Sequence, residues 1–280
     1  MWFGTRVFMQ EVPDPTPDLE YPDTGWEAST QYENGGLGVS QSVSKHGEYL
    51  LTWDVMERAE VRKITDYADG VYGTGLIYWL DPVAIDQNVL PQSWAVPALA
   101  AEDAIPLVGD ARPATTDNTN FSQGYPAKKA VYTVTDASVS RSIFIPIPTG
   151  YVAWVGVHGE TSAQDFIKVT PYVGAVAGTP VYPTILGVAT ATRVNTEISA
   201  ATGMELSVDV SEAGEGASFT VTGMIVQILP DGDTPETGGF ISGQGHSGCR
   251  FMGRPVKTPY GTRNNLVGLS VKLGEVGEWL

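Results

Sequence analysis

Short apolar runs that recur between turn residues dominate the second half of this 280-residue chain. β-Branched and aromatic residues fill the runs, and clusters of Gly, Pro, Ser or Asp separate them. They cover residues 130–135, 142–147, 151–158, 166–173, 181–188, 205–210 and 218–229. Regularly spaced short strands with turn signals are typical of a β-sandwich or jelly roll. The sequence therefore predicts a mainly-β fold, and the 32 glycines and 19 prolines agree with many turns.

A compact α+β unit is predicted before this region. Apolar and polar residues alternate along residues 49–56, as in a strand with one buried face. Residues 58–69 are the best helix candidate, because Val61, Ile64 and Ala68 fall on one stripe and a glycine follows. A short helix beside strands indicates that this part of the chain has a core of its own.

The end of the chain is predicted to return to that unit. Residues 266–273 alternate so that one face is apolar, and such a strand packs on a core. Termini that lie close together make domain insertion easy. We therefore expect a module built from residues 1–87 and 236–280, with residues 88–235 inserted as a β-sandwich.

Residues 11–25 form a separate, proline-rich segment. They contain four prolines and five acidic residues but no Lys or Arg. Proline fixes φ and lacks a backbone donor, so the segment is expected to be extended. It is either an exposed loop or an arm that lies on a neighbouring molecule.

The charge balance excludes one class of partner. The chain has 16 basic and 32 acidic residues, which gives a net charge of −16. A phosphate backbone is bound by clustered cations, so the sequence predicts no direct binding to nucleic acid.

The charges are also segregated along the chain. No Lys or Arg lies between Arg193 and Arg250, whereas eight acidic residues do. After them come five basic residues: Arg250, Arg254, Lys257, Arg263 and Lys272. Opposite charges could meet between neighbouring copies in a head-to-tail ring, with Arg250, Arg254, Lys257 and Arg263 at the interface. The alternative is a solvated surface without a partner.

Several catalytic motifs match only in part. Residues 243–248 read G-x-G-x-x-G, but no helix can follow them to complete a dinucleotide site. Ser247 lies in a string close to a nucleophile elbow, yet no His follows it. Cys249 and His246 could form a thiol–imidazole pair, although a buried Cys is the simpler interpretation. We expect no catalytic residue, metal or cofactor.

Membrane and disulfide chemistry are not expected either. A single cysteine cannot form an internal disulfide. The first residues lack the apolar run of a signal peptide, and no stretch approaches the roughly 18 apolar residues of a span. Synthesis in a cytoplasm is the expectation.

Two regions resemble a known family. The stretch Tyr-Gly-Thr-Gly-Leu-Ile-Tyr-Trp-Leu-Asp-Pro at residues 72–82, with residues 88–97 after it, resembles minor tail proteins of siphophages that infect actinobacteria, a group related to distal tail proteins. The closing part, residues 243–251 and 273–279, is similar to the end of the same family. The resemblance covers both ends of the chain well and the middle loosely.

This resemblance implies a structural, non-enzymatic virion protein at the tail tip. It implies a homo-oligomeric ring, expected to be a hexamer, in contact with the tail tube protein, the tape measure protein and other tail-tip proteins. It also implies that ring interfaces use main-chain pairing and apolar patches. The residues that it marks as structural are Tyr72, Gly73, Gly75, Trp79, Asp81, Pro82, Trp94, Gly274, Val276, Gly277 and Trp279.

A second hypothesis is a carbohydrate- or receptor-binding module of the virion that contacts host cell-wall glycan. The stretch of residues 120–126, which contains Tyr125, loosely resembles carbohydrate-binding jelly rolls. Sugars stack on exposed aromatic rings, and Trp154 and Tyr125 are the candidates. Trp154 could equally belong to the core.

Overall fold

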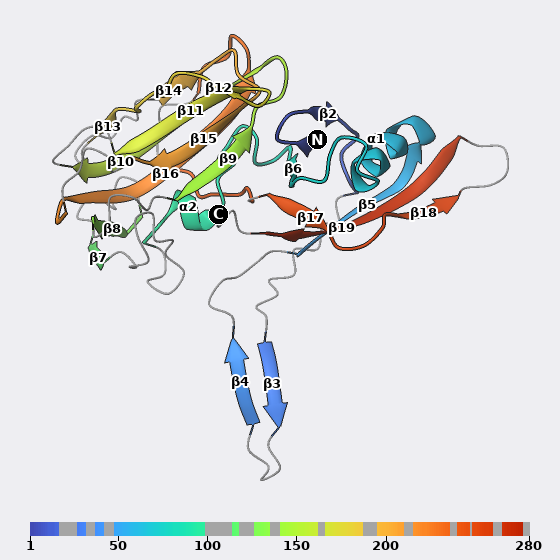
Figure 1. Cartoon of the computed structure of the whole chain (residues 1–280), viewed down its shortest axis with the longest axis horizontal. Coiled ribbons are helices and arrows are strands. Elements are labelled where there is room, and N and C mark those ends of the chain that lie inside the picture. Colours follow the sequence, from blue (N-terminus) through green and yellow to red (C-terminus); the bar gives the residue numbers. More distant parts are fainter. Residues whose placement is uncertain are drawn as a thin grey trace.

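The chain folds into two lobes and a separate two-stranded hairpin (Figure 1). The computed structural model describes residues 1–16, 27–31, 37–41, 48–98, 114–117, 126–134, 141–161, 166–186, 195–209, 215–235, 240–246, 248–259 and 265–276. The hairpin consists of β3 (Glu27–Gln31) and β4 (Leu37–Gln41), which pair only with each other among the described strands. Most described elements are strands, so the predicted mainly-β fold is confirmed.

The first lobe, here called the sheet lobe, is built from both ends of the chain. Its seven strands are β1 (Trp2–Thr5), β2 (Met9–Glu11), β5 (Glu48–Glu57), β6 (Ile77–Leu80), β17 (Cys249–Phe251), β18 (Val256–Pro259) and β19 (Leu266–Glu275). They pair antiparallel in the order β18–β19–β17–β6–β1–β2, and β5 pairs with β19. The sheet thus joins residues 2–80 to residues 249–275.

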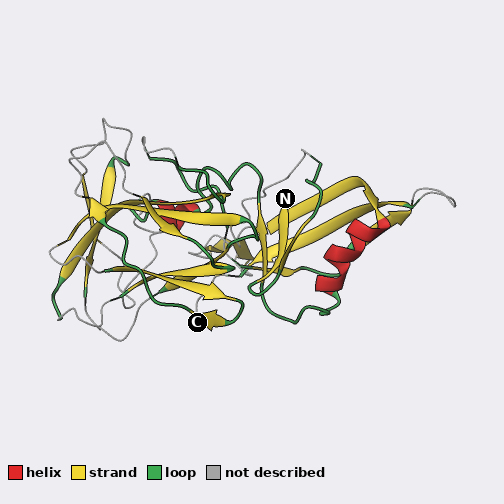
Figure 2. Ribbon diagram, turned by 90° about the horizontal axis from the view of Figure 1, so that it is seen from above, coloured by secondary structure: helices red, strands yellow, loops and turns green. Residues whose placement is uncertain are grey.

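One helix covers the core face of this sheet. Helix α1 (Arg58–Ala68) buries Val61, Ile64 and Tyr67, and its core cluster includes Leu51 of β5 and Val271 of β19. The helix predicted over residues 58–69 is confirmed to within one residue, since Asp69 is the C-cap and a glycine with φ of 76° follows. Figure 2 shows α1 lying against the strands of this lobe.

The second lobe, here called the sandwich lobe, has two antiparallel-rich sheets around one core. One sheet contains β7 (Ala114–Asp117), β8 (Lys128–Thr133), β10 (Tyr151–Thr161), β13 (Ile185–Leu186), β14 (Asn195–Ile198) and β16 (Ser218–Pro230). The other contains β9 (Ser142–Pro146), β11 (Ile167–Val173), β12 (Val176–Ala177) and β15 (Gly203–Val208). Inward side chains from both sheets, such as Val155, Val226, Val169 and Leu206, share one core cluster.

The predicted strands of this lobe match at most positions, with one clear exception. Of the strand predicted over residues 181–188, the described residues 181–186 contain a single bridge at Val181 and a two-residue strand, β13, and no continuous strand. Val181 pairs with Val169, whereas β13 pairs with β10 in the other sheet. This part of the chain thus contacts both sheets, which a single regular strand could not do.

The two connections between the lobes lie side by side. The outgoing connection, residues 81–98, includes helix α2 (Gln92–Ala95), and residues 240–246 belong to the returning connection. Gln244 donates its backbone N–H to the carbonyl of Asn88, and Gly245 donates to that of Leu90. A side chain at position 245 would overlap the Val89 carbonyl. The glycine-rich string of residues 243–248 therefore reflects close backbone approach.

The side chain of Asn88 joins these connections to the longest strand. Asn88 has no exposed surface. Its amide Nδ2 donates to the carbonyls of Met224 (3.1 Å) and Ile241 (2.9 Å). Its Oδ1 accepts from the backbone N–H groups of Val226 (3.0 Å) and Leu90 (3.2 Å). All four hydrogen-bonding positions of a buried amide are therefore satisfied.

We predict that Asn88→Ala lowers the free energy of unfolding by about 3 kcal/mol, because buried donors and acceptors lose their partners. Chemical denaturation followed by intrinsic fluorescence measures the change. Gln244→Ala is the matched control, since it removes an amide that bonds the Gln87 side chain at the surface. A loss for Asn88→Ala no larger than that of the control would contradict the assigned role.

Candidate functional site

The two segments that carry the family resemblance meet in the sheet lobe. Cys249 of β17 lies opposite Ile77 of β6 on one side and opposite Glu275 of β19 on the other. Close to Cys249 in this sheet, the side chain of Trp79 is 1% exposed. Its ring stacks on the ring of His246, with the ring centres 4.1 Å apart. The rings of Tyr49 and Trp79 are 5.4 Å apart in an edge arrangement. Residues far apart in sequence thus form one aromatic cluster.

The same cluster contains the thiol–imidazole pair considered from the sequence. The sulfur of Cys249 is 3.9 Å from Nδ1 of His246. Cys249 has no exposed surface, however, so its thiol cannot reach a substrate while the sheet is intact. The structure therefore explains Cys249 as part of the core of the sheet lobe.

The structural residues implied by the resemblance fall into two groups. Trp79 and Trp94 are buried, in β6 and α2 respectively, and they belong to the cores of different lobes. Asp81 forms a turn at the end of β6, where its Oδ1 accepts the backbone N–H of Val83 at 2.8 Å. Pro82 lies in that turn.

The remaining implied residues are at turns and at the strand end. Gly73 has φ of 100°, which favours glycine, whereas a Cβ added at Gly75 would meet no atom within 4 Å. Gly274 lies beneath the sulfur of Met252, and Val276 donates its backbone N–H to Gly248. Gly277 and Trp279 lie outside the described residues.

Arg6 links the two lobes, although no pattern in the sequence indicates this role. Its guanidinium lies 4.2 Å from the ring centre of Phe144 and 4.6 Å from that of Tyr172. It also pairs with Glu205 at 3.3 Å, and the Tyr172 hydroxyl bonds the same carboxylate. A cation between two rings and a carboxylate holds the turn after β1 against the sandwich lobe.

Exposed apolar side chains gather beside this link. They come from three turns: residues 7 and 8 after β1, residues 71 and 72 after α1, and residues 173 and 176 around the β11–β12 turn. We call this set the turn patch: Val7, Phe8, Val71, Tyr72, Val173 and Val176, each at least 38% exposed. The patch therefore includes Tyr72, one of the residues that the resemblance marks.

The turns of this patch touch one another. The rings of Phe8 and Tyr72 are 5.3 Å apart, and Tyr72 also packs on Tyr67 at 4.6 Å. A side chain at Gly174 would lie 3.7 Å from Val7. Burial raises the pKa of Tyr67 to about 12, so its hydroxyl stays protonated and donates to the Phe8 carbonyl at 3.2 Å.

The cations predicted at a subunit interface lie at the surface of the sheet lobe. Arg250, Arg254 and Lys257 are exposed, and none of them has an ion pair in the part of the chain that is described. Arg263 lies outside the described residues. Lys272 is paired with Glu48 at 2.6 Å.

The acidic residues of the sandwich lobe are only partly available to a partner. Glu205 and Asp209 are already paired, with Arg6 and with Lys168 respectively. Asp231 and Asp233 are exposed at the end of β16. Ion pairs within the chain therefore reduce the number of acidic side chains that could attract the basic segment of a neighbouring copy.

Of the two proposed sugar-stacking residues, the structure describes Trp154, and its ring is not an exposed platform. Trp154 is half-buried on the side of β10 opposite the core, where it lies between Glu197 and Gln227 in register. Tyr125 lies outside the described residues. Tyr182, which no sequence pattern marks, is 40% exposed and donates to Asp209 at 3.1 Å.

Neither metal clusters nor relatives define the site further. The described residues contain no group of three or more His, Cys, Asp or Glu that could hold a metal ion. Among them, no helix is long and apolar enough to cross a membrane. Comparison with models of protein families, with curated proteins and with solved structures found no match.

We predict that Cys249 in the native protein reacts with dithionitrobenzoate roughly a hundredfold more slowly than in denaturant, because reaction requires opening of the sheet. Absorbance of the released thiolate measures the rate, and Cys249→Ala gives the background. Rapid reaction of the folded protein would contradict this burial and would favour a thiol-based activity.

Proposed function

We propose that the chain is a structural component of a bacteriophage tail tip. It would act as a minor tail protein of the distal-tail type that forms a ring with copies of itself. The ring would join the tail tube to the tip or baseplate, in contact with the tail tube protein, the tape measure protein and other tail-tip proteins. Its role would be assembly and not catalysis.

One observation carries this proposal. The segments that resemble the family, at residues 72–82 and at residues 243–251 and 273–279, are joined in one sheet through the pairing of β17 with β6 and β19. A shared sheet is the arrangement expected if both segments belong to one module. The sandwich lobe between them is held against this module by Arg6 and by aromatic pairs such as Trp2 with Tyr151 at 5.7 Å.

Light scattering after gel filtration, with negative-stain images of the same fraction, tests the proposal. The expected result is a closed ring of several chains, with six expected from the resemblance. A monodisperse monomer across the accessible concentration range would contradict the ring.

We further predict that Arg254→Glu combined with Lys257→Glu weakens ring assembly roughly tenfold, because charges at an interface rim favour association with an acidic partner. The ring fraction against protein concentration measures the effect. Lys128→Glu is the control, because it reverses an exposed charge on the sandwich lobe. Equal behaviour of the two variants would remove these cations from the interface.

Glycan binding by the sandwich lobe is a second candidate, and the exposed ring of Tyr182 favours it. Asp209 and Lys168, which are 3.3 Å apart, add polar groups beside that ring. An aromatic face with neighbouring polar groups is a common form of sugar site.

If this candidate is correct, Tyr182→Ala weakens binding to purified actinobacterial cell-wall glycan about tenfold, since ring stacking contributes about 1 kcal/mol. A sedimentation assay with the insoluble glycan measures binding. Tyr72→Ala is the control, because Tyr72 is similarly exposed at 38% but belongs to the sheet lobe. If the unaltered protein does not sediment with the glycan, glycan binding is rejected as a function of this lobe.

A further inference from the structure

Backbone hydrogen bonds and glycines define the shape of the turns that carry the turn patch. Thr5 donates its backbone N–H to the Phe8 carbonyl at 2.9 Å, and Gly4 lets the chain pass close to Phe8. Glycine residues with positive φ, Gly70 and Gly174, shape the other two turns. A contiguous exposed apolar patch on a fixed frame marks an interaction site more often than a single exposed residue does.

A second exposed surface lies on the opposite face of the sheet. We call it the outer sheet face: Leu50, Arg250, Met252, Val256 and Lys272. Leu273 of β19 is in the core with α1, so its neighbour Gly274, covered by Met252, faces the other way. Val256 is opposite Ser270 and shares that face. Leu50, Met252 and Val256 are 40%, 42% and 63% exposed.

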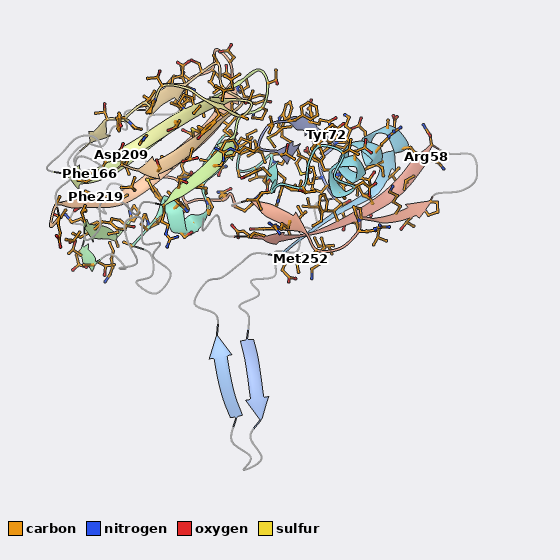
Figure 3. All side chains as sticks on the ribbon, viewed as in Figure 1. Arg58, Tyr72, Phe166, Asp209, Phe219 and Met252 are labelled. Atoms are coloured by element: carbon orange, nitrogen blue, oxygen red, sulfur yellow. The ribbon has the colours of Figure 1, made fainter. Side chains whose placement is uncertain are left out.

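The two surfaces lie on different sides of the sheet lobe. Tyr72 follows α1 and packs on its Tyr67, whereas Met252 lies on the face of the sheet that α1 does not cover. Figure 3 shows Tyr72 on the α1 side of this lobe and Met252 on the other side. One chain can therefore use both surfaces at once, for two different neighbours.

Their charges are complementary. Beside the turn patch, Arg6 pairs with Glu205 and Arg62 pairs with Asp66, which leaves the exposed Asp69 next to Val71. On the outer sheet face Arg250 is an exposed cation, and the exposed Arg254 lies in the turn between β17 and β18, whereas Lys257 is opposite Leu269 and so lies on the other face of the sheet. Opposite charges around two apolar surfaces steer and orient their association.

We propose that the turn patch of one copy docks on the outer sheet face of a second copy of this chain, head to tail. The inference rests on the proposed ring and identifies the contact that closes it. Such a contact is heterologous, because it pairs two different surfaces: the chain that contributes its turn patch keeps its outer sheet face free, and its neighbour keeps its turn patch free. Repetition around an axis then closes a ring.

Single substitutions at the most exposed apolar residues test the contact with little risk to folding. Val71→Glu places a charge in the turn patch, and Val256→Glu places one in the outer sheet face; these residues are 64% and 63% exposed. Val83→Glu is the matched control at 61% exposure, because it lies in the turn after β6, outside both surfaces. Circular dichroism checks that each full-length variant is folded.

Each surface variant alone is expected to remain monomeric at concentrations where the unaltered protein and Val83→Glu form rings, a loss of at least about a hundredfold in affinity. Analytical ultracentrifugation measures the mass. A mixture of Val71→Glu and Val256→Glu is expected to form a species of two chains and nothing larger. Each variant keeps the surface that the other has lost, so only one contact can form.

The other outcomes overturn the inference in distinguishable ways. If Val256→Glu alone assembles fully, the outer sheet face is not needed, and if Val71→Glu alone does, the turn patch is not. If both variants form normal rings, the contact lies elsewhere but the proposed ring stands. If the unaltered protein is monomeric throughout, both the contact and the proposed ring are wrong.

Discussion

The buried amide of Asn88 holds together the place where the chain leaves the sheet lobe and returns to it. An inserted lobe needs two connections, and here both run beside β16 with their backbones in contact. Backbone N–H and C=O groups that are buried at this point need hydrogen-bond partners. Without partners, the free-energy cost of burying them would exceed the stabilisation that packing contributes. Asn88 supplies partners to both connections, and glycines at 243 and 245 allow the close approach.

Because the two connections are held together, the sheet lobe and the sandwich lobe are also held in place relative to each other. With the lobes held together, Arg6 can insert between Phe144 and Tyr172 of the sandwich lobe. That contact places Val7 beside the β11–β12 turn, so the turn patch contains residues of both lobes. The patch is therefore a product of the joined lobes, and neither lobe alone would display all of it.

Local patterns in the sequence were sufficient for the elements but not for these contacts. The apolar stripe of α1 and the alternation of β5 are readable because each pattern repeats within a few residues along the chain, although β5 pairs with the distant β19. Asn88 and Val226 are 138 residues apart, and Arg6 and Glu205 are 199 residues apart. Nothing around a lone Arg or Asn indicates a partner so distant.

The sheet edges bear on how copies of this chain could associate. Lys63 donates to the Glu11 carbonyl at the β2 edge, and Thr16 bonds the outer edge of β5 at Thr52. The β18 edge carries Lys257 and Pro259, which discourage strand addition. Association of the sheet lobe is therefore more favourable through side-chain surfaces than through added strands. If copies of the chain pair through their main chains, strands outside the sheet lobe are better placed to do so. Among these, β3 and β4 pair only with each other in the described structure.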